Sequence, residues 1–220
     1  MWERKVSGVD MGKEFDVLIQ GGTVFDGSGN PGRRADVAVR GDKVALVEDS
    51  LEGRSAGKVI DARGLVVAPG FIDPHSHTDV ELLVNPKAES KIRQGVTTEI
   101  GGNCGFTAFP LSPLNIEKTR HYLKEKYDFD LNWADVDTFF RRLEVCGMAV
   151  NYATLLGHGN VRGAVLGMED RCATAEEIER MRLVVRKHLE AGVFGLSSGL
   201  IYTPGCYAEA EEIIELCREV

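Results

Sequence analysis

The sharpest chemical signal in the sequence is a pair of histidines, His75 and His77, separated by one residue and placed just after the apolar stretch 71–73. In a β-strand, side chains two positions apart point to the same face. Both imidazoles would then converge at the carboxyl end of that strand. Imidazole is a preferred ligand of zinc and other divalent transition metals. We therefore predict that His75 and His77 bind a metal ion.

A cysteine occupies the corresponding place after the next expected strand, residues 96–100. Cys104 lies in the run Gly-Gly-Asn-Cys-Gly, and glycines of this kind allow backbone or ligand to approach closely. A thiolate is a good zinc ligand. A free cysteine is, however, often just a small buried apolar side chain. From its position alone, Cys104 could be either.

Other polar residues near expected strand ends have less specific interpretations. His158, between two glycines, is expected to support the site or the fold rather than to bind metal, and Asp79 could equally support the site or be a solvated loop acid. Asp73 is as readily a structural hydrogen-bond acceptor as a functional group. The hydroxyl of Ser198, like that of Ser197, could hold a polar group of a substrate or belong to a well-bonded loop. No serine-hydrolase elbow, phosphate-binding loop or dinucleotide fingerprint is present.

Residues 67–220 alternate strand and helix patterns, which is typical of βα units around a parallel sheet. Strands are expected at 71–73, 96–100, 150–156 and 193–196, with helices at 85–94, at 136–144, after the capping box Thr174-Ala-Glu-Glu177, and from 207 onward. Residues 107–147 read as an insertion. Because a (β/α)8 barrel takes about 250 residues, this region predicts about half of a TIM-type barrel.

The N-terminal part has a different pattern. Residues 13–66 contain about six short strand patterns and a hairpin signal at Gly41-Asp42, which favours a small, incomplete β-sandwich module. Residues 1–12 are expected to form a tail. The fold class predicted for the whole chain is therefore α/β, with a β module followed by a partial barrel.

Composition restricts the partners. The 220 residues carry 26 basic and 34 acidic side chains, a net charge of −8, which argues against nucleic acid and against an anionic membrane surface. The five cysteines form no closely spaced pair and no disulfide framework. Neither a signal peptide nor a membrane-spanning run is visible. We expect a cytoplasmic protein whose unpaired strand edges could promote self-association.

The motifs together resemble the amidohydrolase superfamily, metal-dependent hydrolases built on a (β/α)8 barrel with a flanking β-sandwich. The segment Val67-Ala-Pro-Gly-Phe-Ile-Asp-Pro-His75-Ser-His77 carries the superfamily resemblance. The segments around Cys104, Leu156-Gly-His158-Gly-Asn-Val-Arg162 and Gly195-Leu-Ser-Ser-Gly-Leu-Ile-Tyr202-Thr-Pro-Gly205 resemble more narrowly the N-acyl-D-amino-acid deacylases. The resemblance extends over nearly all of the chain after Met11.

The resemblance implies roles for the matched residues. His75 and His77 would bind one zinc position, Cys104 would bridge to a second, and Tyr202 would help to hold the carboxylate of an N-acyl amino acid substrate. The general-base aspartate, expected from the eighth barrel strand, would lie beyond Val220. We therefore expect the 220-residue chain alone, a partial chain, to be inactive.

Two alternatives stay open. One is a related hydrolase of cyclic amides, although the absence of lysine from residues 192–203 disfavours the hydantoinase and dihydroorotase branches, which carry a bridging lysine there. The other is a catalytically inactive fragment.

Overall fold

The chain folds into two units, one ending at Pro69 and one spanning Gly70–Val220. The structure is a computed structural model that describes residues 12–220. The tail expected over residues 1–12 therefore lies, except for Gly12, outside the described residues.

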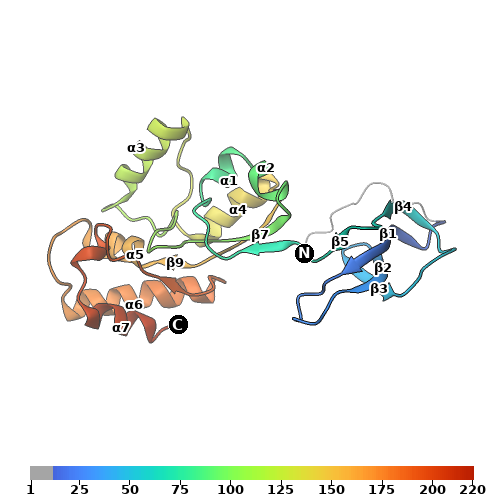
Figure 1. Cartoon of the computed structure of the whole chain (residues 1–220). Coiled ribbons are helices and arrows are strands. Elements are labelled where there is room, and N and C mark those ends of the chain that lie inside the picture. The colour runs from blue at the N-terminus through green and yellow to red at the C-terminus, as the bar shows by residue number, and fades with distance from the viewer. Residues whose placement is uncertain (1–11) are drawn as a thin grey trace. The chain divides into compact units, whose positions relative to one another are not determined.

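The first unit is built on one five-stranded sheet (Figure 1). Strand β1 (Phe15–Val24) pairs antiparallel with β2 (Arg33–Arg40), and β2 pairs antiparallel with β3 (Lys43–Glu48). The other edge of β1 is parallel to β4 (Ala56–Asp61) and β5 (Val66–Val67). One small core, formed by Phe15, Leu18, Ala38 and Leu51, lies against this sheet.

The expected hairpin is confirmed, because Arg40 pairs with Lys43 across Gly41-Asp42, and Gly41 has a φ of 61°. Two adjacent glycines, Gly21 and Gly22, lie within β1. Strand β1 continues through both glycines, with an irregular register between Ile19 and Gly22 that the left-handed backbone of Gly21 accommodates. A β-sandwich is not confirmed, since the described strands of this unit all belong to a single sheet.

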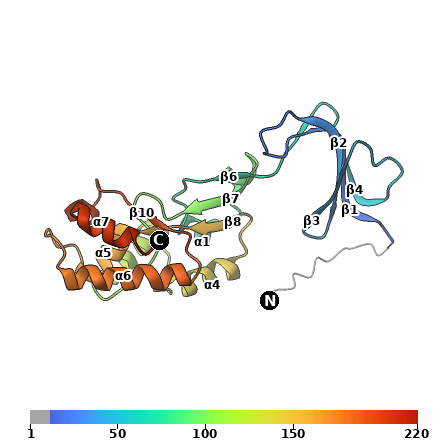
Figure 2. The ribbon, with the colours of Figure 1, turned by 90° about the horizontal axis from the view of Figure 1, so that it is seen from below.

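The second unit is a mixed α/β structure with parallel strands. Strand β6 (Phe71–Asp73) pairs with β7 (Val96–Gly101), and β7 pairs with β8 (Asn151–Thr154). A further parallel pair joins β9 (Leu156–Gly157) to β10 (Leu196–Ser197). The expected strand at 150–156 is thus divided at Leu155. The carboxyl ends of neighbouring strands meet on one edge, as Figure 2 shows for β6, β7 and β8.

Seven helices are described, and they surround these strands (Figure 1). They are α1 (Glu81–Val84), α2 (Glu89–Ile92), α3 (Ile116–Tyr127), α4 (Val136–Cys146), α5 (His158–Leu166), α6 (Ala175–Glu190) and α7 (Ala210–Cys217), with a 3-10 turn at Gly205–Tyr207. Helix α6 starts at the predicted capping box, in which Thr174 and Glu177 each bond the other's backbone N–H. None of the helices within residues 12–220 is long and apolar enough to cross a membrane.

The helices differ from expectation in two respects. Of the helix expected at 85–94, only α2 (Glu89–Ile92) forms, because Pro86 and the left-handed backbone of Ala88 (φ 43°) separate it from α1, which ends at Val84. Helices α3 and α5 were not expected. The helix expected at 136–144, within residues 107–147, is confirmed as α4, which directly precedes β8 and buries Phe139 and Leu143 in the main core.

The expected distinction between an inserted segment and the barrel region is therefore too coarse. Trp133 and Phe109, both from residues 107–147, are 4% and 0% exposed and belong to the same core as Leu156, Met181 and Val185. Aromatic side chains of this size bury much apolar area. Most of this segment is consequently an integral part of the unit, and α3, whose only buried residue is Leu123, is its most peripheral helix.

Candidate metal centre

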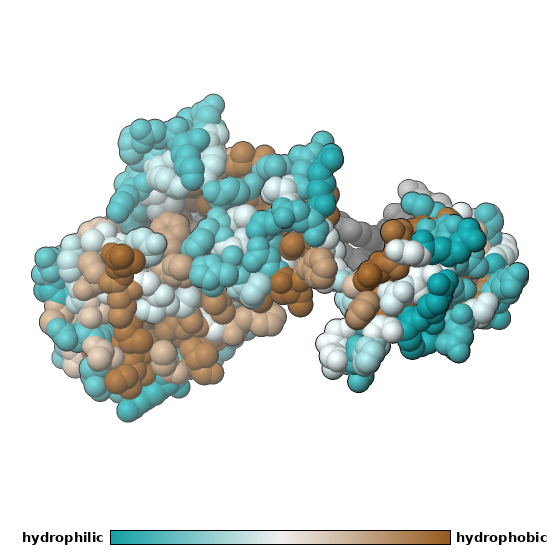
Figure 3. All heavy atoms as spheres, in the orientation of Figure 1, coloured by the Kyte–Doolittle hydropathy of each residue, from teal (hydrophilic) through white to brown (hydrophobic). Residues whose placement is uncertain are grey.

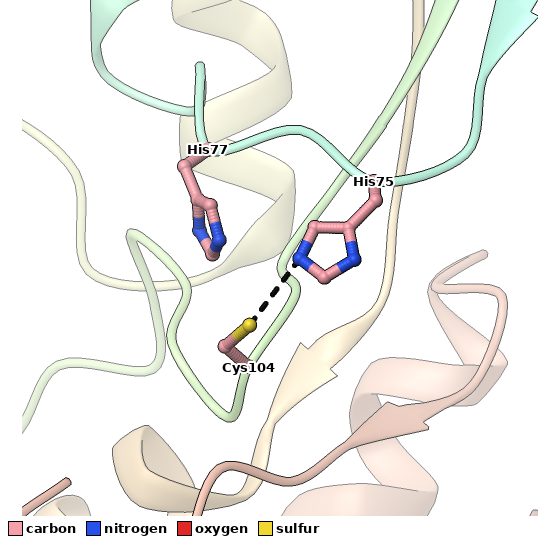
Figure 4. Close-up of side chains that lie close together, drawn as sticks. All are labelled: His75, His77 and Cys104. Carbon is pink, nitrogen blue, oxygen red and sulfur yellow. Dashed lines mark hydrogen bonds between the residues drawn. The ribbon is translucent and has the colours of Figure 1, made fainter.

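His75, His77 and Cys104 lie together, as the close-up in Figure 4 shows. One potential ligand atom from each residue lies within 4.8 Å of those of the other two. The Sγ of Cys104 is 3.3 Å from Nε2 of His75, and the two imidazole rings are 5.3 Å apart. Among residues 12–220 this is the cluster of histidine, cysteine and carboxylate side chains that could hold a metal ion.

The three side chains come from loops at the carboxyl ends of adjacent strands. The histidines follow β6 and the cysteine follows β7, and these strands pair in parallel. Both histidines are exposed, whereas Cys104 is partly buried. The convergence thus brings together residues 29 positions apart in the sequence without burying them.

The backbone at Cys104 is unusual. Its φ of 55° lies in the left-handed region, which costs a non-glycine residue roughly 1–2 kcal/mol. The loop after β10 lies directly against it, because a Cβ on Gly199 would come within 2.0 Å of the Cys104 carbonyl oxygen. Such strain persists only where the surroundings impose it, and it concentrates at functional sites.

A buried ionic network holds the histidine loop in place. Glu99 of β7, 0% exposed, accepts hydrogen bonds from Ser76 Oγ at 3.2 Å and Thr78 Oγ1 at 2.8 Å. Lys91 bridges Glu99 at 2.8 Å and Asp73 at 2.6 Å, and Asp73 also accepts from the His75 N–H. The hydrogen bond from Lys91 lowers the pKa of the Asp73 carboxyl group. Asp73 therefore acts here as a charged hydrogen-bond acceptor beside the histidines.

Neither Glu99 nor Lys91 was singled out from the sequence. One signal could have identified Glu99, namely a carboxylate within a strand of otherwise neutral residues, Val96–Gly101. Buried charges of this kind are almost always paired. No comparable signal exists for Lys91, which lies on a four-residue helix.

Asp79 is buried, at 6% exposure, so it is not the solvated loop acid that was one of its two expected roles. The Tyr152 hydroxyl donates a 2.8 Å hydrogen bond to it. Burial raises the pKa of the Asp79 carboxyl group. Its place two residues after His77 suits a supporting role.

His158 is also buried, but its partners lie elsewhere. As the first residue of α5 it donates through Nε2 to Glu212 of α7 at 2.7 Å, because a carboxylate can only accept. Arg162 donates to the other oxygen of the same carboxylate. His158 does not join the cluster of His75, His77 and Cys104.

A cavity of about 320 Å³ adjoins Cys104. Its walls come from the loops after β7 and β10, from α3 and from α5, and include Phe106, Lys118, Tyr122, Met168 and Tyr202. Of the two residues expected to bind substrate, Tyr202 lines this cavity and Ser198 does not. Ser197 instead fixes the loop, since its Oγ accepts from the Gly105 N–H at 3.0 Å and donates to the Gly102 carbonyl.

With this geometry in view, the comparisons with known proteins assign the class. A model of the Amidohydrolase family matches residues 58–218. The chain belongs to the Amidohydrolase family. The predicted superfamily resemblance is confirmed.

Individual relatives narrow the likeness to deacylases. The chain is 44% identical over 206 residues to a D-aminoacylase from Alcaligenes xylosoxydans xylosoxydans, covering 93% of this chain and 42% of the relative. An N-acyl-D-glutamate deacylase from the same organism is 39% identical, with 94% and 42% covered. The chain thus spans less than half the length of these relatives.

A solved structure of a deacylase is also similar to this chain. The N-acyl-D-glutamate deacylase from Bordetella bronchiseptica, complexed with zinc and a phosphonate mimic of the tetrahedral intermediate, superposes with a TM-score of 0.85. The two share 38% sequence identity, and the match covers 94% of this chain and 43% of the other.

Proposed function

We propose that His75, His77 and Cys104 bind zinc. Around one tetrahedral zinc ion, with Zn–N near 2.0 Å and Zn–S near 2.3 Å, donor atoms lie roughly 3.3–3.7 Å apart. The 3.3 Å between Cys104 Sγ and His75 Nε2 fits this spacing, and the third donor lies within 4.8 Å. A thiolate can also bridge two ions, so the set suits one or two divalent metals.

We further propose that the protein hydrolyses the amide bond of N-acyl-D-amino acids. The observation that carries this proposal is the convergence of two imidazoles and a thiol beside a cavity, in a chain 44% identical to a D-aminoacylase. Zinc at such a site polarises a carbonyl group and lowers the pKa of water. The specificity for the D-isomer rests on the relatives alone.

The remaining residues of the site would position the substrate or the histidine loop. Tyr202 would hold the substrate's carboxylate from the cavity wall, and the exposed Ser198 could reach polar groups of the substrate at its mouth. Asp79 and the Lys91–Glu99 pair hold the histidine loop from below. We assign no general base within the chain, and we place that aspartate on a later barrel strand.

The parallel strands of the second unit fit the first part of a (β/α)8 barrel, with the site at the carboxyl ends of the strands, where barrel enzymes place it. The first unit would belong to the flanking β module. All five cysteines are unpaired, which supports a reducing compartment such as the cytoplasm.

A chimeric enzyme tests the function. Residues 12–220 would replace the matching region of the 44%-identical D-aminoacylase, and hydrolysis of N-acetyl-D-methionine would be measured with zinc present. We expect turnover by the chimera, none by its Cys104→Ala variant, and none by the 220-residue chain alone. A folded chimera that binds zinc but does not hydrolyse any N-acyl-D-amino acid would refute the proposal.

A further inference from the structure

The cavity beside Cys104 has an apolar rim that is exposed to solvent. Phe106 is 62% exposed, Tyr122 45%, Met168 39% and Tyr202 60%, and all four line the same 320 Å³ space. Exposed apolar side chains gathered at one concave site mark a place where something binds. A volume of this size suits a small molecule.

Only one residue of the cavity lining carries a formal charge, and it is Lys118 of α3. In the part of the chain that the structure describes, its ammonium group makes one polar contact, to Met168 Sδ at 3.9 Å, and no ion pair. The next lysines on the same helix are different. Lys124 pairs with Asp128 at 2.6 Å, and Lys126 pairs with Glu81 at 3.6 Å.

The two amide side chains of the lining already make hydrogen bonds within the protein. Asn115 accepts from the Ser112 N–H at 2.7 Å and donates to the Pro110 carbonyl at 3.1 Å, and Asn160 accepts from the Thr107 N–H at 2.8 Å. Lys118 is the charged group that the cavity lining offers, and its hydrogen-bonding capacity is largely unused. An ammonium donates up to three hydrogen bonds and accepts none.

We propose that Lys118 is a specificity-determining residue that selects substrates carrying a second carboxylate, in addition to the carboxylate of the amino acid itself. This inference rests on the proposed function, in which Cys104 marks the reacting end of the substrate and Tyr202 takes the amino acid carboxylate. Lys118 reaches the cavity from a different element, α3, and so contacts a different part of the ligand. The second carboxylate comes from an acidic side chain or from a dicarboxylic acyl group.

The peripheral placement of α3 makes it suited to this role. The helix buries only Leu123, and its visible surface is hydrophilic (Figure 3). Residues on it can change without disturbing the core, so the charge at position 118 sets ligand preference independently of the fold.

The test compares ligands that differ only in one charge. Dissociation constants for the zinc-loaded 220-residue chain would be measured by calorimetry with N-acetyl-D-glutamate against N-acetyl-D-glutamine, and with N-succinyl-D-leucine against N-butanoyl-D-leucine. Variants would be Lys118→Gln, Lys118→Arg and the matched control Lys124→Gln. The first ligand pair reports on an acidic side chain and the second on an acidic acyl group.

We expect Lys118→Gln to weaken binding of at least one dianionic ligand about tenfold and of its neutral partner less than twofold, since a charge-assisted hydrogen bond is lost. Lys118→Arg should retain the preference, and Lys124→Gln should leave all constants unchanged. Equal weakening of all four ligands would overturn the inference, because Lys118 would then contact the shared carboxylate.

Two further outcomes separate the inference from the function. Binding of all four ligands without any dependence on Lys118 would overturn the inference alone. Failure of the wild-type chain to bind any of them would count against the proposed function as well.

Discussion

Two histidine-containing clusters of the second unit differ in what their histidines can bind. His75 and His77 are exposed, and their nitrogens converge with a thiol within 4.8 Å. His158 is 0% exposed, and its Nε2 is already bonded to Glu212 at 2.7 Å. Both clusters include histidines that follow parallel strands. The difference is that the first cluster has unused donor atoms at its surface, whereas the second is a closed contact between helices.

The two clusters should contribute to different properties, one to metal binding and the other to the stability of the fold. The buried cluster joins α5 to α7 through a carboxylate shared by His158 and Arg162, and Arg162 is 0% exposed. A buried charge that loses its partner destabilises a fold strongly. The exposed cluster buries little, so its loss should affect metal affinity and hardly affect folding. Substitutions in each cluster can test whether the two properties are separable in this way.

The largest effect is expected for Glu212→Gln. The substitution removes the negative charge that compensates the buried Arg162 guanidinium, and we expect the unfolding free energy to fall by about 3–5 kcal/mol in urea denaturation. Glu211→Gln, one residue earlier on the exposed side of α7, should cost less than about 1 kcal/mol. Comparable losses in the two variants would show that the buried network does not stabilise the fold.

The converse substitution is His75→Ala. We expect zinc affinity, measured by competition with a chromophoric chelator, to fall about 100-fold, because even supporting residues of metal sites contribute 10- to 100-fold. Without metal, the unfolding free energy should change by less than about 0.5 kcal/mol, as for other exposed positions. His121→Ala, an exposed histidine on α3, is the matched control and should change neither quantity.

Cys104 offers a ligand atom and also has a left-handed backbone, so it bears on metal affinity and on stability. Cys104→Ala and Cys104→Gly should lower zinc affinity equally. Glycine, however, adopts a φ of 55° without strain, so we expect the glycine variant to be about 1 kcal/mol more stable than the alanine variant. Thermal denaturation without metal would measure this, and equal stability would mean that the backbone there is not strained.

The comparison also explains which features could be predicted from the sequence. The i, i+2 spacing of His75 and His77 predicts that they converge in an extended backbone, and they do converge although both lie in the loop after β6. The pattern Thr174-Ala-Glu-Glu177 is a local signal that the structure confirms as a helix start. Both depend on residues close in sequence. That Cys104 would come within 3.3 Å of His75 depends on parallel pairing of β6 with β7, which the sequence indicates only through its strand pattern.

Features that depend on tertiary contacts could not be predicted from the sequence pattern. His158 reads as a loop residue because glycines flank it, yet it begins α5, whose helical conformation is stabilised by burial of Val161 and Leu166. The pairing of Lys91 with Glu99 joins a short helix to a strand and leaves no periodic signal. Lys118 likewise lines the cavity because of where α3 lies in the fold, and its neighbours in the sequence give no sign of this.

The smallest expected effect is for Glu177, a carboxylate that is neither an exposed metal ligand nor part of the buried His158 cluster. Glu177 of α6 accepts hydrogen bonds from Arg171 at 2.7 Å and from the Thr174 N–H at 2.8 Å, and the Arg171 contact chiefly lowers the pKa of Glu177 to about 2. Because the folded-state pKa lies below the ordinary value of 4.5, this stabilisation is complete above about pH 4.5 and is lost as the pH falls towards 2.

We therefore expect Glu177→Gln to lower the unfolding free energy by about 1 kcal/mol at pH 6 and by much less at pH 3, when urea denaturation is followed at both values. Glutamine still fits the capping box, so α6 keeps its start and only the charge is removed. Glu176→Gln, its exposed neighbour in the same helical turn, should show little change with pH. If the Glu177 variant lost the same free energy at both pH values, its contribution would come from hydrogen-bond geometry rather than ionisation, and this carboxylate would resemble the closed His158 contact rather than a titrating surface pair.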